Sequence, residues 1–443
     1  MRSGRRLAVL VVALTLVGAP AVVLRAFCVG QSCSQGEAAV AAPVPFCPLP
    51  GDLRAAIETG YRQGRSPDVM GASVSSPVIG GSGAGIPLTG WPAAPYAEGA
   101  NRVPIAFVGA GTRAGALPAH VGVDRIAPTI ARLIGYDRPY ADVRSGTALA
   151  AAVSEGADPR LVVEIAWTGV GSAAFTPTAA PWVEHHVLRS PHAASTIAAT
   201  TGSLPADPAA VLTTIGTGGL PFQHGITGTL VRGAQGRAVR AWSPGAPISI
   251  IGTLADDWDH ASGQRARIGL VAPDTVDRGV IGGTWYLDHD RDDVVIGSSD
   301  PAGAVERLVA SGFGADATSD ILAVVLDGSS GRMDRITGRI VTAVQRSVPD
   351  SAFVLTATGP TYTSTSEGVS ATTIMDRVNA ALGADVIASS TPGGFFLDTR
   401  VMAANDLTSD DVVRQMDALE GGDGTPVFAD AYPGFAVSFS RYC

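Results

Sequence analysis

The sequence predicts an α/β protein, a three-layer α/β/α sandwich built on a mostly parallel central sheet. Apolar runs such as "RLVVEIAW" (160–167) and "DILAVVLD" (320–327) show almost no polar alternation, which is typical of strands buried on both faces. Helix-length segments such as "PAGAVERLVASG" (301–312) separate these runs. The hydrophobic share of 46% over 443 residues supplies enough apolar surface for a large core.

Apolar, β-branched runs and amphipathic stretches alternate along the chain. The stretch 333–347 places Met333, Ile340 and Val344 on one helical face and arginines on the other. A second helix is predicted over 407–424, with Thr408 or Ser409 as its cap and glycines at its end. Similar patterns occur at 103–109, 126–135, 246–257, 266–272, 293–297 and 351–359, and Gly-, Ser- and Pro-rich loops are expected over 71–102 and 356–373.

The first residues predict an export signal. Three arginines precede an uncharged apolar stretch from Leu7 to Leu24, which Arg25 follows. This pattern indicates either a cleaved signal peptide or a retained membrane anchor over residues 1–27, and both alternatives stay open. We therefore expect an extracytoplasmic protein, secreted or anchored, that meets the membrane only through this segment.

The remaining chain is expected to be a cysteine-containing linker over 28–47 and a single domain over 48–443, with 229–300 as a candidate cap or insert. The net charge of -9 is spread without a basic stripe, which argues against a nucleic-acid partner. All 31 basic residues are arginine, a bias typical of a GC-rich bacterial genome.

Four cysteines lie near the two ends of the chain, outside the apparent core segments: Cys28, Cys33, Cys47 and Cys443. In an exported protein this even count indicates two disulfides. We favour Cys28 with Cys33 and Cys47 with Cys443, because the second bond would tie the ends of the folded part together. Free thiols and a zinc site are the alternatives, and zinc is disfavoured because no histidine accompanies the cysteines.

Several segments resemble the alkaline phosphatase superfamily, in particular its type I phosphodiesterase/nucleotide pyrophosphatase branch. They are "TGGLPFQHGITG" (217–228), "GRSPDVM" (64–70), "RVPIAFVGAGTRAG" (102–115) and "GVDRIAPTIARLIGYDRPYADVRSG" (122–146). In that family the segments like 102–115 and 122–146 come last, whereas here they precede "LVVEIAWTGVG" (161–171), which resembles the family's first strand. The resemblance therefore implies a circularly permuted relative, with the Cys47–Cys443 bond joining the ends that the permutation opened.

This resemblance implies hydrolysis of phosphomonoesters or phosphodiesters by a Ser or Thr nucleophile between two metal ions. Thr168 stands where the family has a metal-binding Asp, and Ala357 and Thr358 stand where it has Asp and His. Asp327 is retained without a nearby histidine, and His224 matches a turn residue that is not a ligand. The usual two-metal site is thus expected to be missing.

The nucleophile is equally ambiguous. Ser203, in the sequence Ser-Leu-Pro, is the first candidate, with Thr201, Thr213 and Thr214 as rivals. The alternative is that Ser203 only caps a helix.

"WYLDHDRDDVVI" (285–296) is the densest group of metal-ligand residue types, with Asp288, His289, Asp290 and Asp292 as candidate ligands for zinc or calcium. A solvated acidic turn is the plainer alternative. A second group, His185, His186 and His192, is interpreted as imidazoles on a helix surface.

Two functions follow. The first is a phosphoester hydrolase with an altered site, which would need a divalent metal such as zinc or calcium. The second is a catalytically inactive binding or scaffold protein of the cell envelope, which needs no cofactor. The expected partner in either case is a small phosphoester or another envelope ligand.

Overall fold

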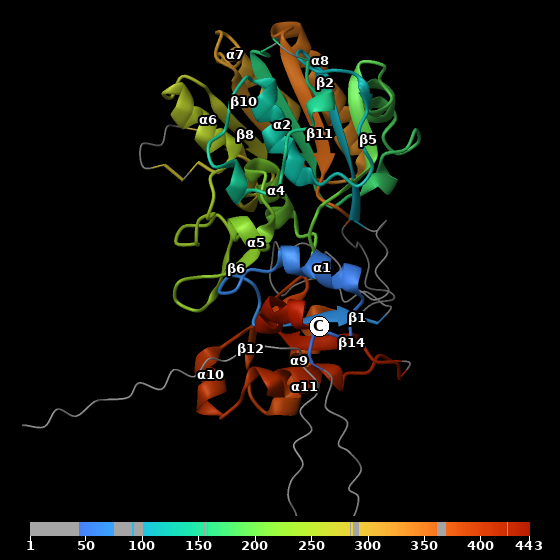
Figure 1. Ribbon diagram of the computed structural model, residues 1–443, viewed down its shortest axis with the longest axis vertical. Coiled ribbons are helices and arrows are strands. Elements are labelled where there is room, and N and C mark those ends of the chain that lie inside the picture. The colour runs from blue at the N-terminus through green and yellow to red at the C-terminus, as the bar shows by residue number, and fades with distance from the viewer. Residues whose placement is uncertain are drawn as a thin grey trace, which may run out of the picture. The chain divides into compact units, whose positions relative to one another are not determined.

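The structure is a computed structural model that describes residues 44–443, apart from 75–90, 93–100, 155, 157, 284, 287–291, 361–368 and 423. Figure 1 shows the arrangement of its helices and strands. Within the described residues no helix is both long and apolar enough to span a bilayer. The apolar stretch 7–24 and the expected Cys28–Cys33 pair lie outside the described residues.

The main sheet has the strand order β3-β5-β2-β11-β4-β10-β8-β9. Five neighbouring strands run parallel: β11 (Ser351–Ala357), β4 (Leu161–Trp167), β10 (Asp320–Leu326), β8 (Ile268–Ala272) and β9 (Asp293–Ile296). β2 (Arg102–Gly109) pairs antiparallel with β11 and with β5 (Ala193–Thr200), and β5 pairs in parallel with the short β3 (Gly115–Ala116). The predicted fold class, α/β with a mostly parallel central sheet, is confirmed.

Helices cover both faces of this sheet. One group is α2 (Ile126–Leu133), α4 (Pro208–Thr217) and α6 (Leu254–Ser262), and the other is α3 (Pro181–Val183), α7 (Pro301–Ala310) and α8 (Ser330–Ser347). The indole Nε1–H of Trp167 in β4 donates to Thr337 Oγ1 of α8 at 3.0 Å. Because strand side chains alternate between faces, Glu164, three residues earlier, points to the opposite side from α8.

A second, four-stranded antiparallel sheet was not anticipated from the sequence. Its order is β12 (Ile387–Thr391), β13 (Gly394–Leu397), β1 (Val69–Ser73) and β14 (Phe428–Pro433). It carries its own hydrophobic cluster, to which α9 (Ala371–Leu382), α10 (Thr399–Ala404) and α11 (Ser409–Asp417) contribute. A two-stranded ribbon, β6 (Leu230–Arg232) and β7 (Ala238–Arg240), follows the short α5 (Pro221–His224).

The two ends of the described chain meet at this second sheet. Strands β1 and β14 pair directly, and α1 (Gly51–Gly60) packs against the C-terminal 3₁₀ segment η8 (Gly434–Tyr442). The Cys47–Cys443 disulfide expected from the sequence is present, and it links residues 396 positions apart.

Most of the expected elements occur close to their predicted bounds. The helix predicted over 333–347 begins earlier, at Ser330, and the one predicted over 407–424 ends at Asp417. Thr408 caps the second helix through a reciprocal contact with Asp411. In the apolar run 246–257 only the last residues are helical, because Thr253 caps α6 and the helix begins at Leu254.

Candidate functional site

The carboxyl ends of the parallel strands bring several predicted residues to one edge of the main sheet. Thr168 follows β4, Asp327 follows β10 and Thr358 follows β11. Asp274 lies two residues beyond the end of β8. This edge is where open α/β sheets bind ligands, so it is the first place to look for chemistry.

Threonine hydroxyls at this edge hold neighbouring strand ends together. Thr168 Oγ1 donates to the carbonyl oxygen of Leu326 at 3.2 Å, and the Thr168 backbone N–H donates to the same oxygen at 2.9 Å. Thr358 Oγ1 accepts the N–H of Gly169 at 3.2 Å. Both hydroxyls therefore connect the turn after β4 to the adjacent strands.

An acidic group lies beside these turns, and the sequence analysis missed part of it. Burial, followed by the negative charges of Asp274 and Asp327, raises the pKa of Asp277 to about 7. Asp277 Oδ2 accepts the N–H of Asp274, and Asp274 forms an ion pair with Arg240 at 2.8 Å. The signal was available: Asp274 and Asp277 stand three apart directly after a predicted strand, the spacing of reciprocal caps.

The candidate nucleophiles lie in and before α4, and the hydroxyl groups of all three candidate threonines are engaged. Thr213 Oγ1 donates to Ala209 O at 2.8 Å, and Thr201 Oγ1 donates to Ser203 O at 3.1 Å. Ser203 does not cap α4. That position belongs to Asp207, whose carboxylate accepts the N–H of Ala209 at 3.0 Å.

His224 has a structural role in the same region. Its Nδ1 accepts the N–H of Ile226 at 3.1 Å, so the ring proton is on Nε2, which lies 3.1 Å from Thr214 Oγ1. Thr214 in turn donates to Ala210 O. Burial lowers the pKa of His224 to about 3, so its ring is neutral at ordinary pH.

Three buried oxygen atoms near the start of α4 have no hydrogen-bond partner among the described residues: Ser203 Oγ, Asp207 Oδ2 and Thr391 Oγ1. The Asp207 and Thr391 atoms lie 3.2 and 3.4 Å from the point where a Cβ on Gly228 would stand. Burial raises the pKa of Asp207, which favours its neutral form. All three side chains are at most 3% exposed, so solvent reaches them little.

Of the four predicted metal ligands, Asp292 alone lies among the described residues. Asp292 forms an ion pair with Arg278, while Asp288, His289 and Asp290 lie outside the described residues. Across the described ranges no three His, Cys, Asp or Glu side chains stand close enough to hold a metal ion.

His185 and His186 of the second histidine group lie on a π-helical turn over Glu184–Leu188, whereas His192 lies outside any helix, in the turn just before β5, so the helix-surface interpretation is wrong for it. The ring of His186 stacks on Trp182 at 4.9 Å between centroids, and His186 Nδ1 lies 3.0 Å from the Trp182 carbonyl oxygen. Asp334 of α8 accepts the N–H groups of Trp182 and Val183. His186 and His192 line a hollow of about 500 Å³ with Trp182 and Gln345.

Another open hollow lies between the β6–β7 turn and the second sheet. It has a volume of about 530 Å³ and is lined by residues that include Arg237, Ser389, Phe396, Asp398 and Arg400. Asp398 Oδ1 is already engaged as the cap of α10, where it accepts the N–H groups of the two residues at 400 and 401. Arg400 Nε lies 3.9 Å from Asp398 Oδ1, so the two guanidinium groups and one carboxylate leave the hollow with a net positive charge.

No family model and no curated protein matches the sequence. Among solved structures, wild-type alkaline phosphatase PafA matches with a TM-score of 0.41 and 14% identity, over 58% of this chain and 76% of that chain. A quadruple mutant of the same enzyme matches with a TM-score of 0.40 and 14% identity, over 58% and 75%. The strand order of this chain's own main sheet shows its α/β fold class.

Proposed function

We propose that this chain is an exported protein with a circularly permuted, alkaline phosphatase-like fold, and that it binds a phosphoester or similar anionic group without hydrolysing it. Two relationships support the permutation. Strand β2, which resembles a closing strand of that family, pairs along β11. The chain ends that a permutation would open are joined by the Cys47–Cys443 bond.

The observation that carries the binding role is the use of the hydroxyl groups at the carboxyl edge. Thr168 and Thr358 stand where the resemblance expects metal ligands. Their hydroxyl groups instead form hydrogen bonds with backbone groups of neighbouring strand ends. Thr213 donates to a carbonyl oxygen of its own helix, α4, and Thr201 donates to one in its own loop. Thr168 and Thr358 therefore stabilise the edge of the sheet, and all four hydroxyl groups serve the backbone, which is a different task from coordinating a metal or attacking a phosphorus atom.

The hollow beside Arg237 and Arg400 is the better place for a ligand. A guanidinium group presents several N–H donors in one plane, which suits the oxygens of a phosphate or carboxylate. Two guanidinium groups outnumber the single carboxylate of Asp398 in this hollow, so one positive charge is left for a further anion.

The test is calorimetric titration of the purified full chain with inorganic phosphate and with a simple phosphodiester. We expect saturable binding that the double variant Arg237→Gln, Arg400→Gln loses. The control is the double variant Arg335→Gln, Arg346→Gln, which removes two exposed arginines of α8 that do not line the hollow. This variant should bind the ligands like the wild type.

Turnover of a phosphomonoester and a phosphodiester is measured on the same samples with added zinc, calcium or manganese. Binding without turnover in every sample is the expected result. Binding that survives in the Arg237/Arg400 variant contradicts the assignment of the hollow, and metal-dependent turnover contradicts the non-catalytic role.

Hydrolysis at an altered site remains the second candidate because Ser203 Oγ and Asp207 Oδ2 are unpartnered among the described residues and lie in one loop. The burial of Ser203 and Asp207 argues against hydrolysis here, because a substrate would have to open this loop to reach the two side chains. If hydrolysis occurs here, Ser203→Ala and Asp207→Asn each abolish turnover while the Arg237/Arg400 variant retains it.

A further inference from the structure

Three aromatic side chains stand exposed along η8. Phe435 is 51% exposed, Phe439 is 54% exposed and Tyr442 is 70% exposed. Their rings follow one another, with 6.4 Å between the centroids of Phe435 and Phe439 and 6.3 Å between those of Phe439 and Tyr442. The guanidinium of Arg441 lies 4.8 Å from the Tyr442 ring centroid. Exposed aromatic groups gathered in this way mark a surface that something else covers.

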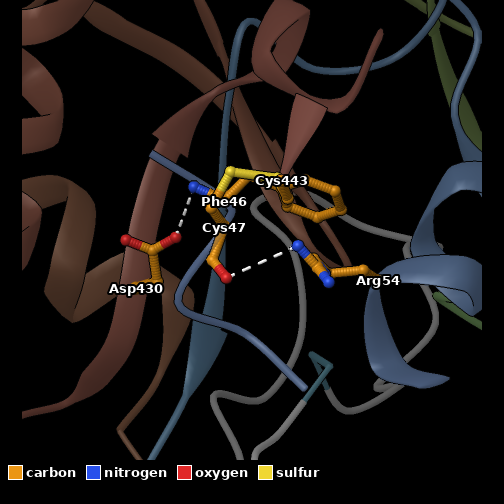
Figure 2. Close-up of a disulfide and its surroundings, with 5 residues drawn as sticks. All are labelled: Phe46, Cys47, Arg54, Asp430 and Cys443. Atoms are coloured by element: carbon orange, nitrogen blue, oxygen red, sulfur yellow. Dashed lines mark hydrogen bonds between the residues drawn. A yellow bond between two sulfur atoms is a disulfide. The ribbon is translucent and has the colours of Figure 1, made fainter. Parts of the chain in front are cut away.

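Val44, a further exposed apolar residue, lies close in sequence to the disulfide-bonded Cys47. Val44 is 64% exposed, and its carbonyl oxygen accepts the N–H of Cys47 at 3.2 Å. The disulfide holds the Cα of Cys47 5.1 Å from that of Cys443, the neighbour of Tyr442 (Figure 2). We call Val44, Phe435, Phe439, Tyr442 and Arg441 the aromatic surface.

The segment that carries the aromatic surface packs on a buried hydrophobic cluster. Val437, on the inner side of η8, is buried in a cluster with Phe46, Leu53 and Tyr432. The backbone N–H of Phe46 donates to Asp430 Oδ2 at 2.6 Å, and Arg54 contacts the Cys47 carbonyl oxygen, as Figure 2 shows. The exposed rings are therefore presented by a packed and covalently closed corner, and their exposure is a property of the fold.

We propose that the aromatic surface lies against the headgroup region of a lipid bilayer, as a second membrane contact beyond the N-terminal segment. Aromatic rings with a rim arginine are the side chains that favour this interface. The apolar stretch that ends at Leu24 is separated from Cys47 by roughly 20 residues, which reach at most about 80 Å when extended and far less as a coil. A bilayer that holds this stretch therefore lies within reach of the aromatic surface.

A second copy of the chain is a poorer occupant. Each partner in a stable dimer buries about 800 Å². Four apolar side chains and one arginine supply only part of that area, whereas they suffice for shallow insertion between lipid headgroups.

The test places the full chain in phosphatidylcholine/phosphatidylglycerol vesicles that contain a phospholipid with a photoactivatable diazirine. After irradiation, the labelled residues are mapped by mass spectrometry. We expect the peptide carrying residues 435–442 to take up several times more label than peptides carrying Ile197, Phe222 and Ile248, which are also exposed apolar residues.

The variant Phe435→Ser, Phe439→Ser, Tyr442→Ser should lose this label, and the matched variant Ile197→Ser, Phe222→Ser, Ile248→Ser should keep it. Label on residues 435–442 no higher than on the three reference residues overturns the proposal. So does a full chain that is dimeric in detergent and becomes monomeric in the triple aromatic variant, because a second copy would then be the occupant. Neither outcome depends on whether the Arg237 hollow binds an anion.

Discussion

Glu164 of β4 and Thr356 of β11 lie on the same face of the main sheet, and each buries an oxygen atom that no described residue hydrogen-bonds. The register pairs Glu164 with Val354, two residues before Thr356, which sets both side chains on one side. Glu164 Oε1 and Thr356 Oγ1 are the atoms concerned. A carboxyl group without a partner in the middle of a core strand is costly when ionised.

Glu164 should make the protein less stable as the pH rises. Burial raises its pKa from 4.5 to about 8, so the unfolded chain ionises between these values while the folded chain stays protonated. At about 1.4 kcal/mol per pKa unit, this one group lowers the free energy of unfolding by several kcal/mol at pH 8 relative to pH 4. In denaturant titrations between pH 5 and 8, we expect the free energy of unfolding of Glu164→Gln to decrease less steeply with pH than that of the wild type. The exposed Glu58→Gln should follow the wild type, and a wild-type slope in Glu164→Gln would contradict the account.

His224 should make the protein less stable as the pH falls. Burial lowers its pKa from 6.5 to about 3, so the unfolded chain binds a proton that the folded chain refuses, and stability falls as the pH drops from 6.5 toward 3. His224→Gln at pH 7 should cost about 1–3 kcal/mol, because Thr214 or Ile226 loses a partner. The difference in free energy of unfolding between His224→Gln and the wild type should become smaller by pH 4. A gap that stays constant with pH, or equal behaviour in the exposed variant His185→Gln, would remove His224 as the cause.

Asp257 should be among the most sensitive positions in the protein. Its Oδ2 binds Arg138 at 2.8 Å and Arg144 at 2.9 Å, and all three side chains are at most 7% exposed. Replacing this carboxylate leaves two buried guanidinium groups without their counter-charge, so Asp257→Asn should cost about 3–5 kcal/mol. Chemical denaturation provides the measurement. Asp350→Asn, in a pair 3.8 Å from Arg160 at the surface, should leave the midpoint unchanged, and equal midpoints for both variants would refute the prediction.

The Cys47–Cys443 bond should contribute about 2–5 kcal/mol, because it closes a very long loop in the unfolded chain. The double variant Cys47→Ser, Cys443→Ser should melt at a lower temperature than the wild type under oxidising conditions. Reductant should bring the wild type down to the variant and leave the variant almost unchanged. A variant as stable as the oxidised wild type would show that the bond is dispensable.

The main sheet was predictable because its strands are buried on both faces and read as unbroken apolar runs, as in 161–167 and 320–326. The second sheet was not, because β1 and β14 come from opposite ends of the chain and β12, with the sequence IASST, is short and largely polar. No local pattern announces such a pairing. The same limit hid Asp257, Arg138 and Arg144, which look like surface charges until the fold brings them together.

The candidate site shows a different limit. The threonines at 168 and 358 could be located by resemblance, but only the folded structure shows that their hydroxyl groups form hydrogen bonds with the backbone. The start of α4 could have been placed better, since Asp207 precedes Pro208, and proline favours the first helical position. The arginine-lined hollow joins a ribbon turn to the second sheet, and its residues share no motif.

The covalent link between residues 47 and 443 gives the polypeptide the topology of a ring. Tension applied to the chain ahead of Cys47 divides there: it passes along the backbone to α1, and it passes through the disulfide to η8 and β14. A processive unfolding machine that pulls from this end would have to draw in two strands of polypeptide together. The corner that carries the exposed aromatic rings is thus also the point at which the disulfide closes the chain into a covalent ring.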